Sequence, residues 1–282
     1  MVDFKEINGG LEVKNNDDFN IKHILECGQL FRFEKTSFGY LIYAKNQKVE
    51  VYCQKATTEI FCKDVNFIKK YFDFDCDYAR IKGELSSKFA LDDAIKFGHG
   101  IRILNSDPLE IIISFIISAN NNIPRIKKII NSICRMCGSY CETYYAFPTL
   151  TQLETLSEND FRAIGCGYRA PYLVETIKQL KCIDINVIKN MPTSLARSEL
   201  LKLKGVGRKV ADCILLFGFH KTDVFPADVW IVKVYNELNG ANLQKASAKK
   251  ISEWFVNKFG ELSGFAQQYL YYERMFRNKE IK

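Results

Sequence analysis

A short connection between two segments of helical periodicity constrains this fold more than any other feature of the sequence. Apolar residues recur at helical spacing from 193 to 203 and again from 206 to 217, and only Gly205, Val206 and Gly207 separate the two segments. This pattern predicts a helix-hairpin-helix over about 193–219. Glycine permits the backbone angles of so tight a turn, and it lets a phosphate approach the N–H groups that begin the second helix.

A lysine and an aspartate accompany this predicted hairpin. Lys209 lies in the first turn of the second helix, where the helix dipole favours anions, so helix stability does not explain it. Asp228 follows Pro226 and is predicted to begin the next helix, 229–238. One helix and a short loop can return Asp228 to the neighbourhood of Lys209, and an amine beside a carboxylate is the minimum equipment for imine chemistry. The alternatives are a phosphate contact for Lys209 and a purely structural cap for Asp228.

The N-terminal part of the chain shows the alternation of strands. Strands are predicted at 30–33, 40–43, 49–52 and 58–62, and helices at 66–72 and 77–89. Asp107 and Pro108 then predict the start of a long helix, and only helical periods and short loops are expected after them. The expected fold is therefore α+β: an N-terminal antiparallel β-sheet domain with helices, 1–106, and an all-α domain, 107–282, that contains the hairpin.

Composition narrows the class of protein. The net charge of +7 favours a polyanionic partner such as nucleic acid. The ten cysteines are scattered, and Cys134, Cys137 and Cys141 lack a nearby fourth ligand for zinc, so we expect no metal site. The N-terminus does not resemble a signal peptide, and the apolar run 111–119 is too short to span a membrane. These features predict a soluble intracellular protein.

The hairpin sequence resembles that of the helix-hairpin-helix DNA glycosylases, with Lys204 where the family usually has proline. Four further stretches resemble the 8-oxoguanine branch of this superfamily and occur in its order: Gly28–Arg32, Asn120–Arg125, Gly165–Ala170 and Phe265–Gln267. No cysteine follows Cys213, so the chain lacks the four ligands of the iron–sulfur cluster that some superfamily members carry after the catalytic aspartate.

The resemblance implies a role for each matching residue. It implies that Lys209 is the nucleophile and that Asp228 stabilises the sugar cation. The residues implied to bind the flipped base are Gly28, Cys213, Gln267 and Tyr271. The residues implied to hold the opposite base or the DNA backbone are Asn120, Arg125, Tyr168, Arg169, Gly205, Gly207 and Trp230, with Tyr168 as a wedge in the base stack.

Each of these residues also has a structural interpretation. Gly28 suits a turn, the asparagines 120–122 suit a helix end, and 168–169 suit an ordinary loop. Gln267 and Tyr271 are one helical turn apart and suit the edge of an amphipathic helix. Trp230 and Tyr271 replace the histidine and phenylalanine of the animal and fungal enzymes, which indicates a divergent, bacterial branch.

The resemblance predicts a monomeric bifunctional 8-oxoguanine DNA glycosylase with β-lyase activity, acting on duplex DNA. It predicts no cofactor and no membrane partner, and it allows a structural alkali-metal ion at the hairpin carbonyls near Gly205 and Val206. A bacterial protein of this kind would be cytoplasmic and associated with the nucleoid. The alternatives are a glycosylase for another damaged base, a non-catalytic helix-hairpin-helix DNA-binding protein, and an interaction protein that shares only the fold.

Overall fold

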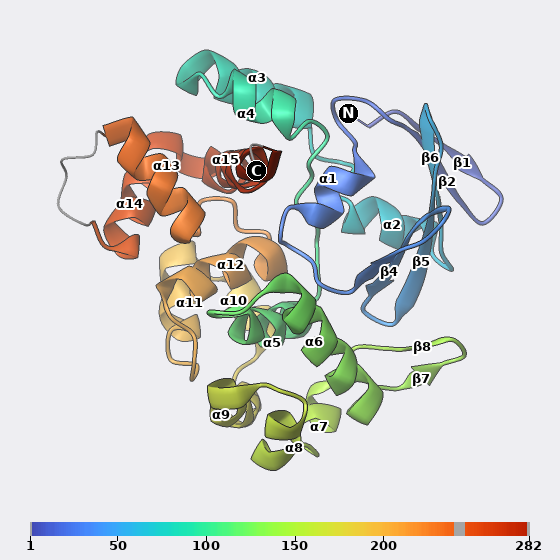
Figure 1. The fold of residues 1–282 in the computed structure, drawn as a ribbon, viewed down its shortest axis with the longest axis vertical. Helices are drawn as coiled ribbons and strands as arrows, with labels where there is room; N and C mark the ends of the chain where they lie inside the picture. Colours follow the sequence, from blue (N-terminus) through green and yellow to red (C-terminus); the bar gives the residue numbers. More distant parts are fainter. Residues whose placement is uncertain (1, 240–245, 281–282) are drawn as a thin grey trace.

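The computed structural model describes residues 2–239 and 246–280, and Figure 1 shows a β-rich region beside a larger group of helices. Six strands form one antiparallel sheet in the order β1-β2-β6-β5-β4-β3. Their bounds are β1 (Phe4–Ile7), β2 (Gly10–Lys14), β3 (Phe33–Lys35), β4 (Gly39–Ala44), β5 (Gln47–Cys53) and β6 (Thr57–Phe61). Alternate apolar residues of these strands are buried against α1 (Ile21–Glu26) and α2 (Val65–Tyr71). This burial is the half-covered arrangement that alternating strands produce.

The remaining helices form the second part of the molecule. They are α3 (Tyr78–Phe89), α4 (Asp92–Phe97), α5 (Pro108–Ser118), α6 (Ile123–Cys137), α7 (Leu150–Leu153), α8 (Glu158–Ala163), α9 (Ala170–Leu180), α10 (Ile185–Asn190), α11 (Thr193–Leu200), α12 (Arg208–Phe219), α13 (Val229–Asn239), α14 (Ala248–Phe259) and α15 (Ser263–Glu280). Two 3-10 turns, η1 (Gly167–Arg169) and η2 (Gly260–Leu262), complete the set. Helix α12 packs on α5, and α15 packs between α4 and α13.

Two hydrophobic cores lie under these elements. The smaller core fills the space between the sheet, α1 and α2. The larger core belongs to the helical part, but it also contains residues that precede Asp107: Cys27, Phe31, Tyr78, Ile81, Leu85, Ala94, Ile101 and Ile103. Helices α3 and α4 therefore pack with the helices that follow them in sequence and not with the sheet.

The predicted helix starts agree with the structure. The Asp107 carboxylate accepts hydrogen bonds from the backbone N–H groups of Leu109 and Glu110, so it caps α5 as expected. Helix α11 ends at Leu200, three residues before its predicted end, because the chain turns through 201–205 to form the hairpin. Gly205 has a φ of +83°, and a Cβ there would lie 2.9 Å from the Tyr172 side chain. The turn thus requires glycine at 205 for two reasons: the backbone has a positive φ, and a side chain would collide with Tyr172.

Several predictions of the sequence were wrong. Strands β1 and β2 and helix α1 were not predicted, and 30–32 precede β3 instead of belonging to it. Arg32 is buried there, and its guanidinium lies 3.7 Å from the Glu110 carboxylate and donates to the Tyr145 carbonyl at 2.5 Å. The chain turns away from the sheet at this point because Arg32 pairs with helix α5 across the two parts of the protein.

The prediction that the region after Asp107 is purely helical was wrong. A small hairpin, β7 (Tyr140–Cys141) and β8 (Tyr144–Tyr145), lies beside the sheet. Tyr144 stacks on Tyr43 of β4 with 5.3 Å between ring centroids, and its hydroxyl donates to the Asn46 carbonyl at 2.5 Å. Two-residue strands carry no recognisable period, and these contacts with a distant part of the chain stabilise the hairpin.

Candidate active site

A small cavity of about 40 Å³ lies where α12, α15, the start of α13 and the segment after α1 meet. Its lining is Cys27, Gly28, Phe115, Lys209, Cys213, Phe217, Pro226, Asp228, Gln267, Gln268 and Tyr271. The structure therefore brings together, from segments far apart in sequence, all the residues predicted to perform the chemistry or to bind the flipped base.

Lys209 enters this cavity from the first turn of α12, one turn before Cys213. Its Nζ lies 5.2 Å from the centre of the Phe115 ring, within the range of a cation–π contact. Among the residues that the structure describes, the Lys209 ammonium forms no ion pair within 4 Å. An amine that is not held by a carboxylate keeps its lone pair accessible once it loses its proton, which a nucleophile requires.

Asp228 begins α13 and faces the same cavity. Its carboxylate accepts hydrogen bonds from the backbone N–H groups of Trp230 and Ile231, each at 3.0 Å, so the predicted cap is confirmed. Burial raises the pKa of Asp228, while these N–H groups and the nearby charge of Lys209 act to lower it. The Asp228 carboxylate is therefore both fixed in position and poorly solvated. Poor solvation strengthens its interaction with a neighbouring cation.

The neighbouring walls are neutral and apolar. Burial raises the pKa of the Cys213 thiol to about 11, and burial raises the pKa of the Tyr271 hydroxyl well above its ordinary value. Gly28 has a φ of +81°, and a Cβ there would lie 3.1 Å from the Tyr271 ring. A glycine at 28 therefore lets Tyr271 approach the backbone closely. Because their pKa values are raised, both Cys213 and Tyr271 stay uncharged near neutral pH.

The residues predicted to contact the opposite base form a second group, outside the cavity, at the loop between α5 and α6. The Tyr168 side chain is 50% exposed, and its hydroxyl donates to the Ala119 carbonyl at 3.2 Å. The Arg169 guanidinium lies 4.3 Å from the centre of the Tyr168 ring. Arg125 donates to the Gly165 carbonyl at 2.8 Å and so joins the same group.

The structure assigns different tasks to the three asparagines of this loop. The Asn121 side chain donates to the Ile117 carbonyl, and the Asn122 side chain accepts from the Arg125 N–H and caps α6. Asn120 has a φ of +51° and is exposed, so it is the asparagine whose side chain remains accessible to a ligand. The helix-end interpretation therefore holds for the other two.

Arg169 is buried, and its guanidinium donates to the backbone carbonyls of Ala119, Asn120 and Cys166. In this arrangement it fixes the loop that carries Tyr168 and Asn120. Its planar fork is turned toward the main chain and not toward solvent.

The hairpin glycines and Trp230 of α13 lie outside the cavity. Gly207 is exposed and begins α12 without a side-chain cap, so the N–H groups of that turn remain open to an anion. Trp230 is half-buried, and the Lys233 ammonium lies 4.4 Å from the centre of its ring system. The structure thus places Gly205, Gly207 and Trp230 apart from the residues of the cavity.

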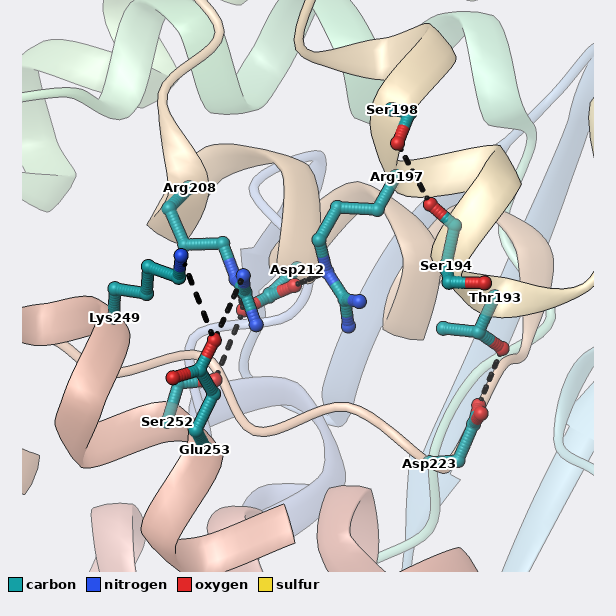
Figure 2. A network of polar contacts seen from close by, with 10 residues as sticks. All are labelled: Thr193, Ser194, Arg197, Ser198, Arg208, Asp212, Asp223, Lys249, Ser252 and Glu253. Carbon is teal, nitrogen blue, oxygen red and sulfur yellow. Dashed lines mark hydrogen bonds and ion pairs between the residues drawn. The ribbon is translucent and has the colours of Figure 1, made fainter.

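A buried network on a neighbouring face of α12 holds the hairpin together (Figure 2). Asp212 is fully buried and accepts from Arg197 of α11 at 2.6 Å, from Arg208 at 3.1 Å and from Ser252 of α14 at 3.2 Å. One carboxylate therefore joins three helices three residues after Lys209. This network was not predicted, because no local pattern distinguishes Asp212 from a surface aspartate of an amphipathic helix.

Sequence reasoning also missed five residues of the cavity: Cys27, Phe115, Phe217, Pro226 and Gln268. Phe217 follows Lys209 and Cys213 at helical spacing, and that signal was available in the sequence. Phe115 lies in a run of apolar residues interrupted only by Ser114, in which no face stands out, so no signal identified it. Within the described residues, no helix is long and apolar enough to cross a membrane, and no three His, Cys, Asp or Glu side chains gather as a metal site would require.

Comparison with known proteins supports these observations. Residues 11–112 match the model of the 8-oxoguanine DNA glycosylase N-terminal domain, and residues 113–260 match that of the HhH-GPD superfamily base excision DNA repair proteins. A probable N-glycosylase/DNA lyase from Methanothermobacter thermautotrophicus is 36% identical over 71% of this chain and 70% of its own length. The N-glycosylase/DNA lyase OGG1 of Arabidopsis thaliana is 33% identical over 70% of this chain and 60% of its own length.

A solved structure agrees over almost the entire chain. The Clostridium acetobutylicum 8-oxoguanine glycosylase/lyase, in complex with double-stranded DNA containing cytosine opposite 8-oxoguanine, superposes with a TM-score of 0.90 at 40% identity. The match covers 99% of this chain and 98% of that one. The chain belongs to the HhH-GPD superfamily of base excision DNA repair proteins, in its 8-oxoguanine DNA glycosylase branch.

Proposed function

We propose that this protein excises 8-oxoguanine from duplex DNA and then cleaves the strand by β-elimination through an imine between lysine and sugar. The observation that carries the proposal is a lysine without an ion-pair partner among the described residues, in one cavity with the half-buried carboxylate of Asp228. The names of the curated relatives and of the matching solved structures, which are glycosylase/lyases, support it.

The reaction begins with the lesion outside the helix. A base within the duplex cannot be reached, so it is flipped into the cavity at a cost of a few kcal/mol. The neutral amine of Lys209 forms a bond to C1′ of the sugar while the bond from C1′ to the base breaks, and the base leaves with that electron pair and takes up a proton. The Asp228 carboxylate stabilises the positive charge that develops on the sugar.

The second step follows from the bond between lysine and sugar. Opening of the sugar ring turns the C–N bond into an imine, which acidifies the hydrogen on C2′. Removal of that proton expels the 3′ phosphate, and the strand is cleaved on the 3′ side. Because only the neutral amine has a lone pair for the attack, binding of DNA has to favour that form by removing water or by transferring its proton.

Recognition of the lesion depends on one hydrogen atom. Guanine has a bare N7 acceptor, whereas 8-oxoguanine has an N7–H donor, and the Gly28 carbonyl is the acceptor that we assign to it. A guanine in this position leaves both groups unpaired, at a cost of about 1–3 kcal/mol. Cys213 and Tyr271 lie against the two faces of the base, and Gln267 binds its Watson–Crick edge.

The exposed group around Tyr168 is the proposed contact with the partner strand. Tyr168 is the wedge that fills the gap left by the flipped base. Asn120 and Arg125 contact the unpaired cytosine, and Arg169 joins them by turning its guanidinium from the Ala119 and Asn120 carbonyls toward the base. The hairpin glycines and Trp230 bind backbone phosphates on either side.

An alkali-metal ion is compatible with the hairpin as a structural element. The Lys204 carbonyl already accepts from the Thr176 hydroxyl at 2.7 Å, and among the described residues no hydrogen bond occupies the carbonyls of Gly205 and Val206. Those two oxygens are the ligands that we assign to such an ion. We further propose that the protein acts as a monomer without a cofactor, beside the chromosome in the cytoplasm of a bacterium.

The test is excision from short duplexes that carry 8-oxoguanine opposite each of the four bases, with undamaged guanine and an alkylated base as controls. We expect release of 8-oxoguanine and strand cleavage, greatest opposite cytosine, and a covalent protein–DNA product when borohydride reduces the imine. Base release without any trapped product would show a monofunctional enzyme that uses water. DNA binding without excision of any lesion would show a non-catalytic hairpin protein.

A further inference from the structure

Two successive glutamines of α15, Gln267 and Gln268, line the cavity that contains Lys209 and Asp228. Both side chains are buried, with 4% and 2% of their surface exposed. Only Gln267 belongs to the motif that suggested the family. Gln268 therefore needs its own explanation. It places a second polar amide in a small cavity where an apolar side chain could have filled the same space.

The hydrogen bonds of the pair leave each amide half used. The Gln268 Nε2 donates to the Gln267 Oε1 at 2.8 Å. The Gln268 Oε1 is buried and has no hydrogen-bond partner among the residues that the structure describes. A buried amide oxygen without a partner is unfavourable, and one that lines a cavity can be satisfied by a ligand that enters it.

The same bond determines what the pair presents to a ligand. Because the Gln267 oxygen is already engaged, its free group is the Nε2 donor. Because the Gln268 nitrogen is engaged, its free group is the Oε1 acceptor, which has two lone pairs. The cavity therefore presents a donor beside an acceptor, at a position where the base of a nucleotide bonded to Lys209 would lie.

We propose that Gln268 is a second specificity-determining residue for the base, alongside Gln267. Its Oε1 accepts hydrogen bonds from the N1–H and the exocyclic N2–H of the flipped 8-oxoguanine, and the Gln267 Nε2 donates to O6. Guanine-type bases carry an acceptor at O6 and an amine donor at N2, so this order of groups suits them. The inference rests on the proposed function. It adds the exocyclic amine to the groups of the base that the cavity recognises.

The experiment compares two lesions and two proteins. The lesions are 8-oxoguanine and 8-oxohypoxanthine, which is 8-oxoguanine without the exocyclic amine, each opposite cytosine. The proteins are the wild type and Gln268→Met, in which a side chain of similar length has no polar group. The measured quantity is the single-turnover rate of base release divided by the half-saturating protein concentration.

We expect the wild type to prefer 8-oxoguanine over 8-oxohypoxanthine by about tenfold, the effect of one hydrogen bond, and the variant to lose most of that preference. The thermal midpoint of Gln268→Met should change little, because the replacement removes the unpaired oxygen but also removes the donor to the Gln267 Oε1. Gln54→Met, in an exposed turn of the sheet, is the matched control and should keep the wild-type preference.

Three results would overturn the inference. If Gln268→Met slows both lesions equally, the glutamine only fills space. If both the wild-type rates and the wild-type preference persist in the variant, another residue reads the amine. Both outcomes leave the proposed function intact, because the wild type still excises 8-oxoguanine. If the wild type releases neither base, the proposed function fails and the inference with it.

Discussion

Two neighbouring faces of helix α12 treat charge in opposite ways. On one face, the Asp212 carboxylate is fully buried and meets Arg208 of its own helix, Arg197 of α11 and Ser252 of α14. On the other face, three residues earlier, the Lys209 ammonium forms no ion pair with any described residue, and the carboxylate that shares its cavity is bonded to backbone N–H groups. A fully paired charge fixes structure, whereas a charge left without a strong partner remains available for chemistry.

The largest expected effect concerns Lys209. Replacement by Gln keeps length and polarity but cannot form an imine, so trapping with borohydride and strand cleavage should fall by several orders of magnitude, as when other enzymes lose a nucleophile. The thermal midpoint should change little, because no ion pair among the described residues is lost. Denaturing gels and a thermal melt measure the two quantities. A trapped product at the wild-type level would show that a different amine is the nucleophile.

Asp212→Ala should produce the opposite result. Removing this carboxylate leaves Arg197 and Arg208 without their buried partner, and breaking such a pair costs about 3–5 kcal/mol of unfolding free energy. At about 2–4 °C per kcal/mol, the thermal midpoint should fall by roughly 10 °C. The variant should still form the trapped product when it is assayed below its own melting temperature.

A matched control for Asp212 lies in the same network (Figure 2). Glu253 is half-exposed, and its carboxylate lies 3.8 Å from Arg208 and 3.9 Å from Lys249. Glu253→Gln should change the unfolding free energy by less than about 1 kcal/mol, because solvent screens an exposed pair. Equal losses for the Asp212 and Glu253 variants would contradict the contrast between the two faces of α12.

Asp228→Asn separates the cap from the chemistry. Asparagine caps helices about as well as aspartate, so α13 should be retained and the thermal midpoint should not fall. The carboxylate charge that we propose to stabilise the sugar cation is lost, and base release should slow by about 10²–10³, the usual effect of removing one preorganised electrostatic group. Single-turnover excision with a binding assay measures both properties. Normal excision by a variant that melts early would reduce Asp228 to a cap.

The smallest effect is a dependence of stability on pH. Because burial raises the pKa of Asp228 above its ordinary 3.8, the folded protein binds this proton more tightly than the unfolded chain does. The contribution of this group to stability is therefore greatest below 3.8 and disappears as pH rises through the folded pKa. Asp228→Asn should gain stability relative to the wild type over that window. Denaturant unfolding at several pH values measures the difference, and a difference that falls with rising pH would contradict the sign.

The sequence predicted those parts of the protein whose structure depends on local chemistry. The hairpin turn needs backbone angles that glycine permits, and Gly205 supplies them. Asp107 and Asp228 cap helices with their own side chains. Buried and more exposed residues alternate over a few positions in the strands at 40–43 and 49–52. The family and the class of fold were predicted correctly for the same reason, because short motifs carry them. The roles assigned to the individual site residues stay predictions.

What the sequence did not predict depends on contacts between distant segments. Arg32 leaves the strand pattern because Glu110 lies far along the chain, and the hairpin at 140–145 exists because Tyr144 stacks on the sheet. Arg169 was predicted to face DNA, and its bonds to the carbonyls of a separate loop could not be foreseen from its motif. Gln268 was overlooked because a glutamine beside a known motif carries no separate signal in one sequence.

The size of the cavity has a consequence for product release. The cavity has a volume of about 40 Å³, only slightly more than the volume of about 30 Å³ that one molecule occupies in liquid water. Ligand pockets usually have volumes of about 300–1,000 Å³. The walls must therefore separate before a purine can enter. A base attached to DNA has the rest of the duplex to drive that opening, whereas the free base must open the walls with its own few contacts. Excised 8-oxoguanine should consequently be a weak product inhibitor, and turnover should not slow as the free base accumulates.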